Sequence, residues 1–398
     1  MNHDVITVGG GLGGSALALS LARKGVRVLV LEREIKFKDR VRGEGILPWG
    51  VNEARDLGVY DLLANSCARP VLFWQSHAWK QRPPRDLVKT TPRGSHCLNF
   101  YHPAMQEVML GAAEQAGATV RREVVVTGVE PGQPPKVISE YKGHRETWEA
   151  RLVVGADGRS SRVRTWGGFH IEHDPECLMI AGVLLEGVQI PEEANHVFRN
   201  SSEGEGALLF PQADGRVRAY YIYRKRGKRL GLSGKKNVPR LLDGCIHTGV
   251  PAEWIQKANP AGPLAEFEGA DSWTPHPYGQ GVALIGAAAA SNDPSWGNGL
   301  SVTLRDVRTL QQSLLADNDW DRAGDDYAAA HDQDFGVINR VNRWLTELLY
   351  EIGPEADKRR DRAFALMQED RSRNPDYIAL GLESPSDEKA RKRMFGEE

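Results

Sequence analysis

Cysteine is scarce in this chain, and its few residues are scattered. Among 398 residues there are four cysteines, which form no CxxC pair and no cluster with histidine: Cys67, Cys97, Cys177 and Cys245. This spacing argues against a disulfide framework and against a cysteine-based metal site. We expect reduced thiols in a reducing compartment and no bound metal.

Long hydrophobic runs and an excess of charge are also missing. No apolar stretch approaches the roughly 20 residues that span a bilayer, and a strand-like segment stands where a signal peptide would lie. Lys and Arg number 51 against 53 Asp and Glu, so the net charge is −2 and gives no indication of nucleic acid or an anionic membrane as partner. We expect a cytoplasmic protein, monomeric or homodimeric.

The first 32 residues carry the pattern of a nucleotide-binding βαβ unit. An apolar run, residues 4–8, enters the turn Gly9-x-Gly11-x-x-Gly14, and a helical segment and a second apolar run follow before Glu32. Gly9 permits the tight turn, Gly11 lets backbone approach a pyrophosphate, and Gly14 lets helix and strand pack closely. Free N–H groups at the helix start attract phosphate, and Glu32 can hydrogen-bond a ribose. The unit predicts an adenine dinucleotide, NAD or FAD, over a purely structural turn.

Two later segments also run from a buried strand into small residues. Residues 151–164 contain Gly155-Ala156-Asp157-Gly158, a turn that would be structural in most proteins but follows a dinucleotide fold here. Residues 282–300 run from a strand through a small-residue helix into a Pro/Gly-rich loop, Pro294 to Gly299. Such a loop can bring backbone amides against a flat ligand.

The middle of the chain has a different pattern. Residues 170–275 show the alternation of antiparallel strands, and the basic run 224–229 is either a solvated hairpin end or a phosphate site for a nicotinamide nucleotide. Several aromatic residues at strand spacing are either core or the lining of an apolar pocket: Phe73, Trp74, Trp79, Phe210 and Tyr221.

Taken together, the three glycine segments over residues 1–330 resemble those of the flavoprotein monooxygenases with the p-hydroxybenzoate hydroxylase fold. The Asp157-Gly158 segment, with Ser161 and Arg164, is similar to the family's Asp-Gly motif. The resemblance implies an α/β protein. Its Rossmann-like FAD-binding domain comprises residues 1–70, 101–169 and 271–330, the inserted antiparallel-sheet substrate domain comprises 71–100 and 170–270, and a helical C-terminal region with a charged tail covers 331–398.

The resemblance also implies which residues hold FAD. They are Gly9, Gly11, Leu12, Gly13, Gly14, Glu32, Arg33, Arg42, His102, Val126, Asp157, Gly286, Pro294, Gly297, Asn298, Gly299 and Leu300. Two positions depart from the family pattern. Ala287 replaces an aspartate that binds a ribityl hydroxyl, and His102 replaces an Arg or Gln that contacts FAD.

The implied function is an FAD-dependent monooxygenase. It would use NAD(P)H and O2 to hydroxylate or epoxidise a small aromatic or hydrophobic substrate through a flavin C4a-hydroperoxide, with Arg42 and Glu44 as candidate catalytic residues. A flavin dehydrogenase or reductase, and a flavin-binding protein without turnover, remain alternatives. The loop around Glu44 also resembles that of flavin-dependent halogenases, but their Trp-x-Trp-x-Ile-Pro motif is absent.

Overall fold

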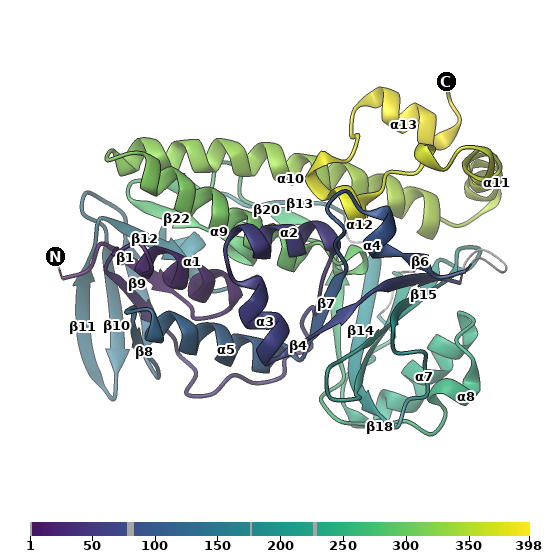
Figure 1. Ribbon diagram of the computed structural model, residues 1–398, viewed down its shortest axis with the longest axis horizontal. Helices are drawn as coiled ribbons and strands as arrows, with labels where there is room; N and C mark the ends of the chain where they lie inside the picture. The colour runs from purple at the N-terminus through teal and green to yellow at the C-terminus, as the bar shows by residue number, and fades with distance from the viewer. Residues whose placement is uncertain (1, 78–82, 176, 226–228) are drawn as a thin grey trace.

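A sheet of six strands forms the centre of the N-terminal part of the computed structural model, which describes residues 2–77, 83–175, 177–225 and 229–398 (Figure 1). Five neighbouring strands are parallel, and the edge strand β21 is antiparallel to β22. The spatial order is β21 (Tyr278–Gly279), β22 (Val282–Leu284), β12 (Leu152–Gly155), β1 (Val5–Val8), β2 (Val28–Leu31) and β8 (Thr119–Arg121).

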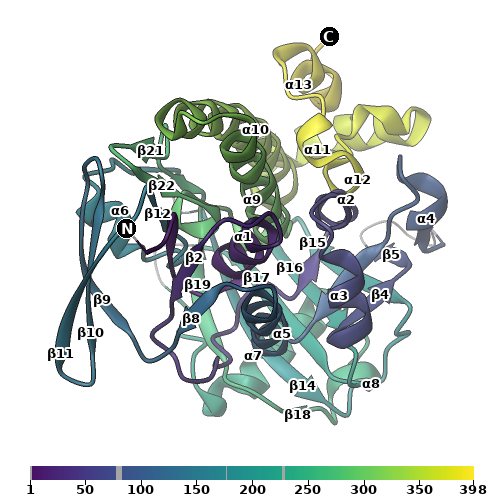
Figure 2. The ribbon, with the colours of Figure 1, turned by 60° about the vertical axis from the view of Figure 1, so that its left-hand side comes forward.

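Both faces of this sheet are covered. Helix α1 (Leu12–Ala22) is apolar and buried around nearly its whole circumference, because it lies between the sheet and two further helices, α5 (His102–Gln115) and α9 (Gly299–Ala316). The opposite face packs against an antiparallel sheet of β9 (Val125–Glu130), β10 (Lys136–Tyr141) and β11 (His144–Glu149). Figure 2 shows α1 and α5 on one side of the sheet and β9–β11 on the other.

A small sheet joins the two parts of the molecule. It contains β3 (Gly45–Ile46), β7 (Cys97–Phe100) and β4 (Ala68–Val71). Residues 48–66 form two helices, α2 (Pro48–Asp56) and α3 (Tyr60–Ser66), because Gly58 turns the chain with φ of +68°. Strand β7 lies in the segment expected to belong to the substrate domain, and it pairs with β3 and β4, which lie almost wholly in the segment expected to bind FAD.

A second large sheet contains most of the strands from residues 73 to 269. Its order is β18 (Asn259–Pro260), β14 (Leu178–Glu186), β17 (Val217–Arg224), β16 (Glu205–Pro211), β15 (Ala194–Asn200), β5 (Phe73–Ser76) and β6 (Arg85–Asp86), with β19 (Ala265–Gly269) also beside β14. The pairs are antiparallel except for β15 with β5. Helices α7 (Val238–His247) and α8 (Ala252–Ile255) contribute to the core on one face, and the other face is turned toward the C-terminal helices.

The C-terminal region is folded along its whole length. Helix α10 (Trp320–Tyr350) lies along α9, and α11 (Pro354–Glu369), α12 (Tyr377–Leu380) and α13 (Glu388–Phe395) follow (Figure 1). The charged composition predicted a tail, but Met394 and Phe395 are fully buried against α10 and α11. In the described part of the chain, no helix has both the length and the apolar character needed to cross a bilayer.

Candidate functional site

The first glycine turn closes so tightly that side chains are excluded from two of its positions. A Cβ on Gly14 would lie 2.0 Å from the Gly9 carbonyl oxygen, and a Cβ on Gly9 would lie 2.6 Å from that of Ala156. At Gly11, in contrast, a Cβ would meet only the end of the Gln106 side chain, at 3.4 Å. The backbone at Gly11 therefore faces free space at the N-terminus of α1.

Glu32 is fixed at the carboxyl end of β2. One carboxylate oxygen accepts a hydrogen bond from the Gly10 N–H at 2.7 Å, and the other accepts one from the Glu34 N–H at 2.8 Å. The side chain is buried beside the glycine turn. This places a carboxylate where a ribose hydroxyl beside the turn would find an acceptor.

A cleft of about 310 Å³ opens beside this turn. Seven of the residues predicted to hold FAD line it: Gly9, Gly11, Glu32, Arg33, Arg42, Val126 and Asp157. Leu12, Gly13 and Gly14 lie just behind it in the first turn of α1. Residues more than 140 positions apart in the sequence thus meet at one cleft, because β1 and β12 are neighbours in the sheet.

The Asp157 side chain is hydrogen-bonded within the protein, whereas the Arg42 side chain is not hydrogen-bonded to any described residue. The Asp157 carboxylate accepts from the Arg162 N–H at 2.7 Å and from the Ser161 hydroxyl, so it caps α6 (Arg162–Trp166). The Arg42 guanidinium lies against Gly158 and forms no ion pair with any described residue. Desolvation in the cleft, and then Arg40 and Arg33, lower the pKa of Arg42. A cation in this setting favours an anionic ligand.

The far end of the site is the turn that follows β22. The Gly286 N–H donates to the Asp306 carboxylate at 2.8 Å, and the other Asp306 oxygen lies 2.9 Å from His331 Nδ1. Burial opposes protonation of His331, but Asp306 outweighs it and raises the pKa. Asp306 on α9 and His331 on α10 thereby fix the turn that contains Ala287. The small-residue helix expected here is a 3₁₀ turn, Gly286–Ala288.

The loop Pro294 to Gly299 is held by side chains on α2 and α10. Gly297 takes a left-handed conformation with φ of +71° after the 3₁₀ turn Pro294–Trp296. Asn298 uses its side chain within the protein, since its oxygen accepts from Trp49 Nε1 and its amide nitrogen donates to Asn342, both at 3.2 Å. Gly299 then begins α9. The N–H groups of Ser295, Trp296 and Gly297 are hydrogen-bonded within the loop, whereas those of Asn298 and Gly299, at the N-terminus of α9, have no partner among the described residues. Leu300 packs beside Gly43.

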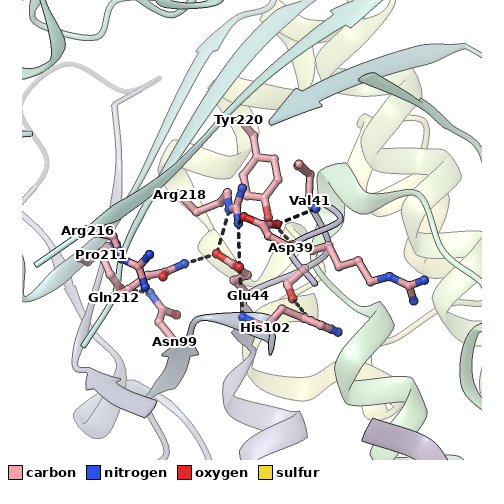
Figure 3. Close-up of polar contacts among 12 residues, drawn as sticks. Asp39, Val41, Glu44, Asn99, His102, Pro211, Gln212, Arg216, Arg218 and Tyr220 are labelled. Carbon is pink, nitrogen blue, oxygen red and sulfur yellow. Dashed lines mark hydrogen bonds and ion pairs between the residues drawn. The ribbon is translucent and has the colours of Figure 1, made fainter. Parts of the chain in front are cut away.

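Glu44 lies in a buried polar cluster (Figure 3). It accepts from Arg218 Nε at 2.8 Å and Nη2 at 2.9 Å, from Gln212 Nε2, and from the His102 backbone N–H at 3.1 Å. Arg218 also pairs with Asp39 at 2.9 Å. Burial raises the pKa of Glu44, against the opposing effect of Arg218. Both carboxylate oxygens are occupied, which favours a positioning role for Glu44 over contact with substrate.

His102 contacts both this cluster, through its backbone N–H, and the segment next to Arg42, through its side chain. Its Nδ1 lies 2.8 Å from the Gly43 carbonyl, and burial followed by the charge of Arg42 lowers its pKa to about 4. His102 is therefore neutral near pH 7, with Nδ1–H donating to Gly43. This interaction fixes the backbone between Arg42 and Glu44.

A second, small cavity lies between the loop Pro294 to Gly299 and the large antiparallel sheet. It has about 20 Å³ of space, and it is lined by Gly45, Leu47, Trp74, Asn195, Arg199, Phe210, Ser295, Trp296 and Tyr377 among others. Of the aromatic residues considered from sequence, Trp74 and Phe210 line it. Tyr221 instead packs in the core with α7, and Trp79 lies outside the described residues. Asn195, Arg199 and Tyr377 were not recognised, although strand alternation places 195 and 199 on one face of β15.

Residues 2–320 match the model of the protein family described as FAD binding domain. The chain belongs to this family. A digeranylgeranylglycerophospholipid reductase of Methanopyrus kandleri is 26% identical over 325 residues, which are 76% of this chain and 74% of the relative. A rifampicin monooxygenase of Streptomyces venezuelae is 26% identical over 377 residues, 89% of this chain and 74% of the relative.

Solved structures support the fold of this FAD-binding protein. A p-nitrophenol 4-monooxygenase of Pseudomonas putida superposes with a TM-score of 0.79 at 18% identity, over 92% of this chain and 94% of that one. The resemblance to flavoprotein monooxygenases and the predicted fold class are confirmed, and the chain is a member of a family of FAD-dependent oxidoreductases.

The residues present fit FAD. Open space at Gly11 and the fixed Glu32 carboxylate suit its ADP half, and the unpaired Arg42 suits its phosphates. The loop amides before α9 suit the polar edge of its ring system. Asp306 accepts a hydrogen bond from the Gly286 N–H and so stabilises the turn that contains Ala287. Ala287 is the position where the family pattern has an aspartate.

Two buried carboxylates, Asp271 and Asp293, lie next to the loop Pro294 to Gly299, and they give a pH prediction. The Asp293 N–H donates to Asp271 at 2.5 Å, and burial raises the pKa of Asp271 to about 7. Because the folded pKa exceeds the unfolded value, the stabilisation is full at acid pH and is lost as pH rises through about 7. We expect thermal unfolding of Asp271→Asn to depend less on pH between 5 and 8 than that of the wild type.

The exposed Asp243 on α7 provides the control for this measurement. Asp243→Asn should keep the wild-type pH dependence of the melting temperature. An unchanged pH dependence in Asp271→Asn would show that Asp271 is ionised in the folded protein across this range.

Proposed function

We propose that this protein is an FAD-dependent monooxygenase that uses NAD(P)H and O2 to oxygenate a small planar or hydrophobic molecule. The observation that carries the proposal is that the cleft and the small cavity adjoin one segment of the chain. Arg42 lines the cleft, and Gly45, three residues further along, lines the enclosed aromatic cavity together with Gly297.

The cofactor and three groups of residues would have separate roles in this reaction. FAD, when bound, supplies hydride acceptance and oxygen activation. The N–H groups at the start of α9 would stabilise negative charge on the reduced ring, and Arg42 would attract the anionic nicotinamide nucleotide or the FAD phosphates. The walls Trp74, Phe210 and Trp296 exclude water, which favours oxygen transfer to substrate over release of peroxide. Glu44 and Arg218 hold the loop that carries Arg42.

The test is a paired measurement on the FAD-loaded protein. Oxygen uptake and NADH or NADPH oxidation are followed together across a panel of aromatic and hydrophobic compounds, with mass analysis of the products. We expect equal consumption of both reactants, faster with a substrate, and a product heavier by one oxygen atom. Oxidation of the nicotinamide nucleotide without oxygen uptake would overturn the proposal in favour of a reductase, the activity in the name of one relative.

Arg42 can be examined in the same experiment. Arg42→Ala should slow anaerobic flavin reduction by NAD(P)H, whereas Arg93→Ala, which removes an exposed pair with Asp56, should not. An unchanged reduction rate in Arg42→Ala would assign nucleotide recognition to other residues.

A further inference from the structure

A buried histidine and a buried aspartate support the turn after β22. His331 lies on α10 and Asp306 on α9, and both side chains are almost completely shielded from solvent. One Asp306 oxygen accepts from the Gly286 N–H at 2.8 Å, and the other lies 2.9 Å from His331 Nδ1. The carboxylate therefore uses one oxygen for the turn and the other for the imidazole.

The same turn packs against the backbone that borders the FAD cleft. The Ile285 N–H donates to the Gly155 carbonyl at 3.0 Å, which connects the turn to the end of β12. A Cβ on Gly13 would lie 3.2 Å from Thr303 Cγ2 and 3.4 Å from Ile285 Cδ1, so the first turn of α1 also packs closely here. The charge of the histidine–aspartate pair is thus only a short distance behind the cofactor site.

This charge can change while the hydrogen bonds of the pair stay as they are. His331 Nε2 is buried and has no partner among the described residues, so Nδ1–H donates to Asp306 whether or not Nε2 carries a proton. With that proton the pair is neutral, and without it the pair is an anion. The Phe335 ring lies parallel to the imidazole, with 6.1 Å between centroids, and helps to hold it in place.

The titratable and charged groups around His331 come from α9 and α10: Arg305, Asp306, Tyr327, Asp332 and Asp334. Burial opposes protonation of His331, but the carboxylates, Asp306 foremost, outweigh it and raise the pKa. Arg305 is paired with Asp334 at 2.7 Å. Burial raises the pKa of Tyr327, which stays neutral. His331 therefore holds its proton to a higher pH than an exposed histidine does and releases it as the pH rises further.

We propose that Asp306 and His331 position the Gly286 turn for FAD, and that the proton on His331 sets how tightly the cofactor is held. The pyrophosphate of FAD is anionic, so a neutral pair should favour binding and an anionic pair should oppose it. The hydrogen bond to Gly286 is present in both states, so charge alone should change the affinity. The inference concerns the cofactor site and is independent of whether the protein oxygenates or reduces its substrate.

The test is an FAD titration of the cofactor-free protein between pH 6 and 9. We expect the wild type to bind FAD about tenfold more weakly at the alkaline end, because one negative charge then acts on the ligand through the protein. His331→Gln keeps a donor to Asp306 but has no proton to lose, so it should bind weakly at every pH. Asp306→Asn keeps an acceptor for Gly286 and removes the charge, so it should bind tightly at every pH. A pair with only a structural role would weaken binding in both variants.

An exposed pair provides the control. His276 Nε2 lies 3.0 Å from Asp325 on α10, and both side chains are exposed, so His276→Gln should keep the wild-type pH profile. A second series in the Asp271→Asn background removes the other group that titrates near pH 7.

Thermal unfolding of each cofactor-free variant shows whether it folds, and if one of the two pair variants does not, the pH profile of the other decides. Wild-type affinity that is constant with pH, a wild-type profile in His331→Gln, or weak binding in both folded variants would overturn the proposal. Failure of the oxygen-uptake experiment would overturn only the proposed function.

Discussion

Replacing Gly11 with alanine should leave the protein folded but remove most of its affinity for FAD. Gly11 has an ordinary extended conformation with φ of −68°, and an added Cβ would meet only the end of Gln106. The same methyl group would occupy the space that a pyrophosphate needs at the start of α1. We expect a cost of about 2 kcal/mol in binding, which is roughly 30-fold in Kd, with the melting temperature of the cofactor-free protein unchanged.

Two further glycine variants make this result specific. Gly14→Ala places a Cβ 2.0 Å from the Gly9 carbonyl oxygen, so it should destabilise the cofactor-free protein as well as prevent FAD binding. Gly111→Ala, in the middle of α5 with nothing within 4 Å of its Cβ, should stabilise the protein by about 0.5–1 kcal/mol and leave FAD affinity unchanged. FAD titration and thermal unfolding of the three variants give both quantities. Wild-type affinity in Gly11→Ala would place the cofactor elsewhere.

The parts of the site that could be predicted from sequence are those encoded locally. The turn within residues 4–32 could be predicted from the glycine spacing and the apolar pattern of one βαβ unit, although Gly9 also packs against Ala156. The Asp157-Gly158 and Pro294–Gly299 segments were also recognised, because each follows its own buried strand. That the three lie at one end of the sheet follows from the pairing of β1 with β12 and of β12 with β22.

The parts that were not predicted depend on partners distant in sequence. Arg218 is 174 residues from Glu44, and nothing in the alternation of residues 217–224 distinguishes it from a surface arginine. Tyr377 reaches the cavity from a C-terminal region whose charge suggested a solvated tail. Arg199 was missed for the same reason, since only the register of β15 against its neighbours and the position of α10 bring it to Trp296.

Breaking the buried pair of Glu44 and Arg218 should cost more stability than any exposed ion pair of this protein. Glu44→Gln keeps the shape of the side chain but leaves Arg218, which is fully buried, with Asp39 as its one remaining carboxylate partner among the described residues. Removing one member of a buried pair costs about 3–5 kcal/mol, because the other charge loses its compensation; since Asp39 still pairs with Arg218, we expect a value at the lower end of this range. Arg218→Met should cost a similar amount, measured by urea unfolding of the cofactor-free protein.

The double variant and a neighbouring arginine separate this effect from ordinary packing loss. Glu44→Gln with Arg218→Met should lose much less than the sum of the single variants, since the charges interact with each other. Arg216→Met removes a partly exposed pair with Asp214 and should cost less than about 1 kcal/mol. Additive losses would contradict the pairing. If Glu44→Gln instead kept full stability and lost oxygenation, Glu44 would act on the substrate itself, as the sequence first suggested, and Arg218 would serve to orient it.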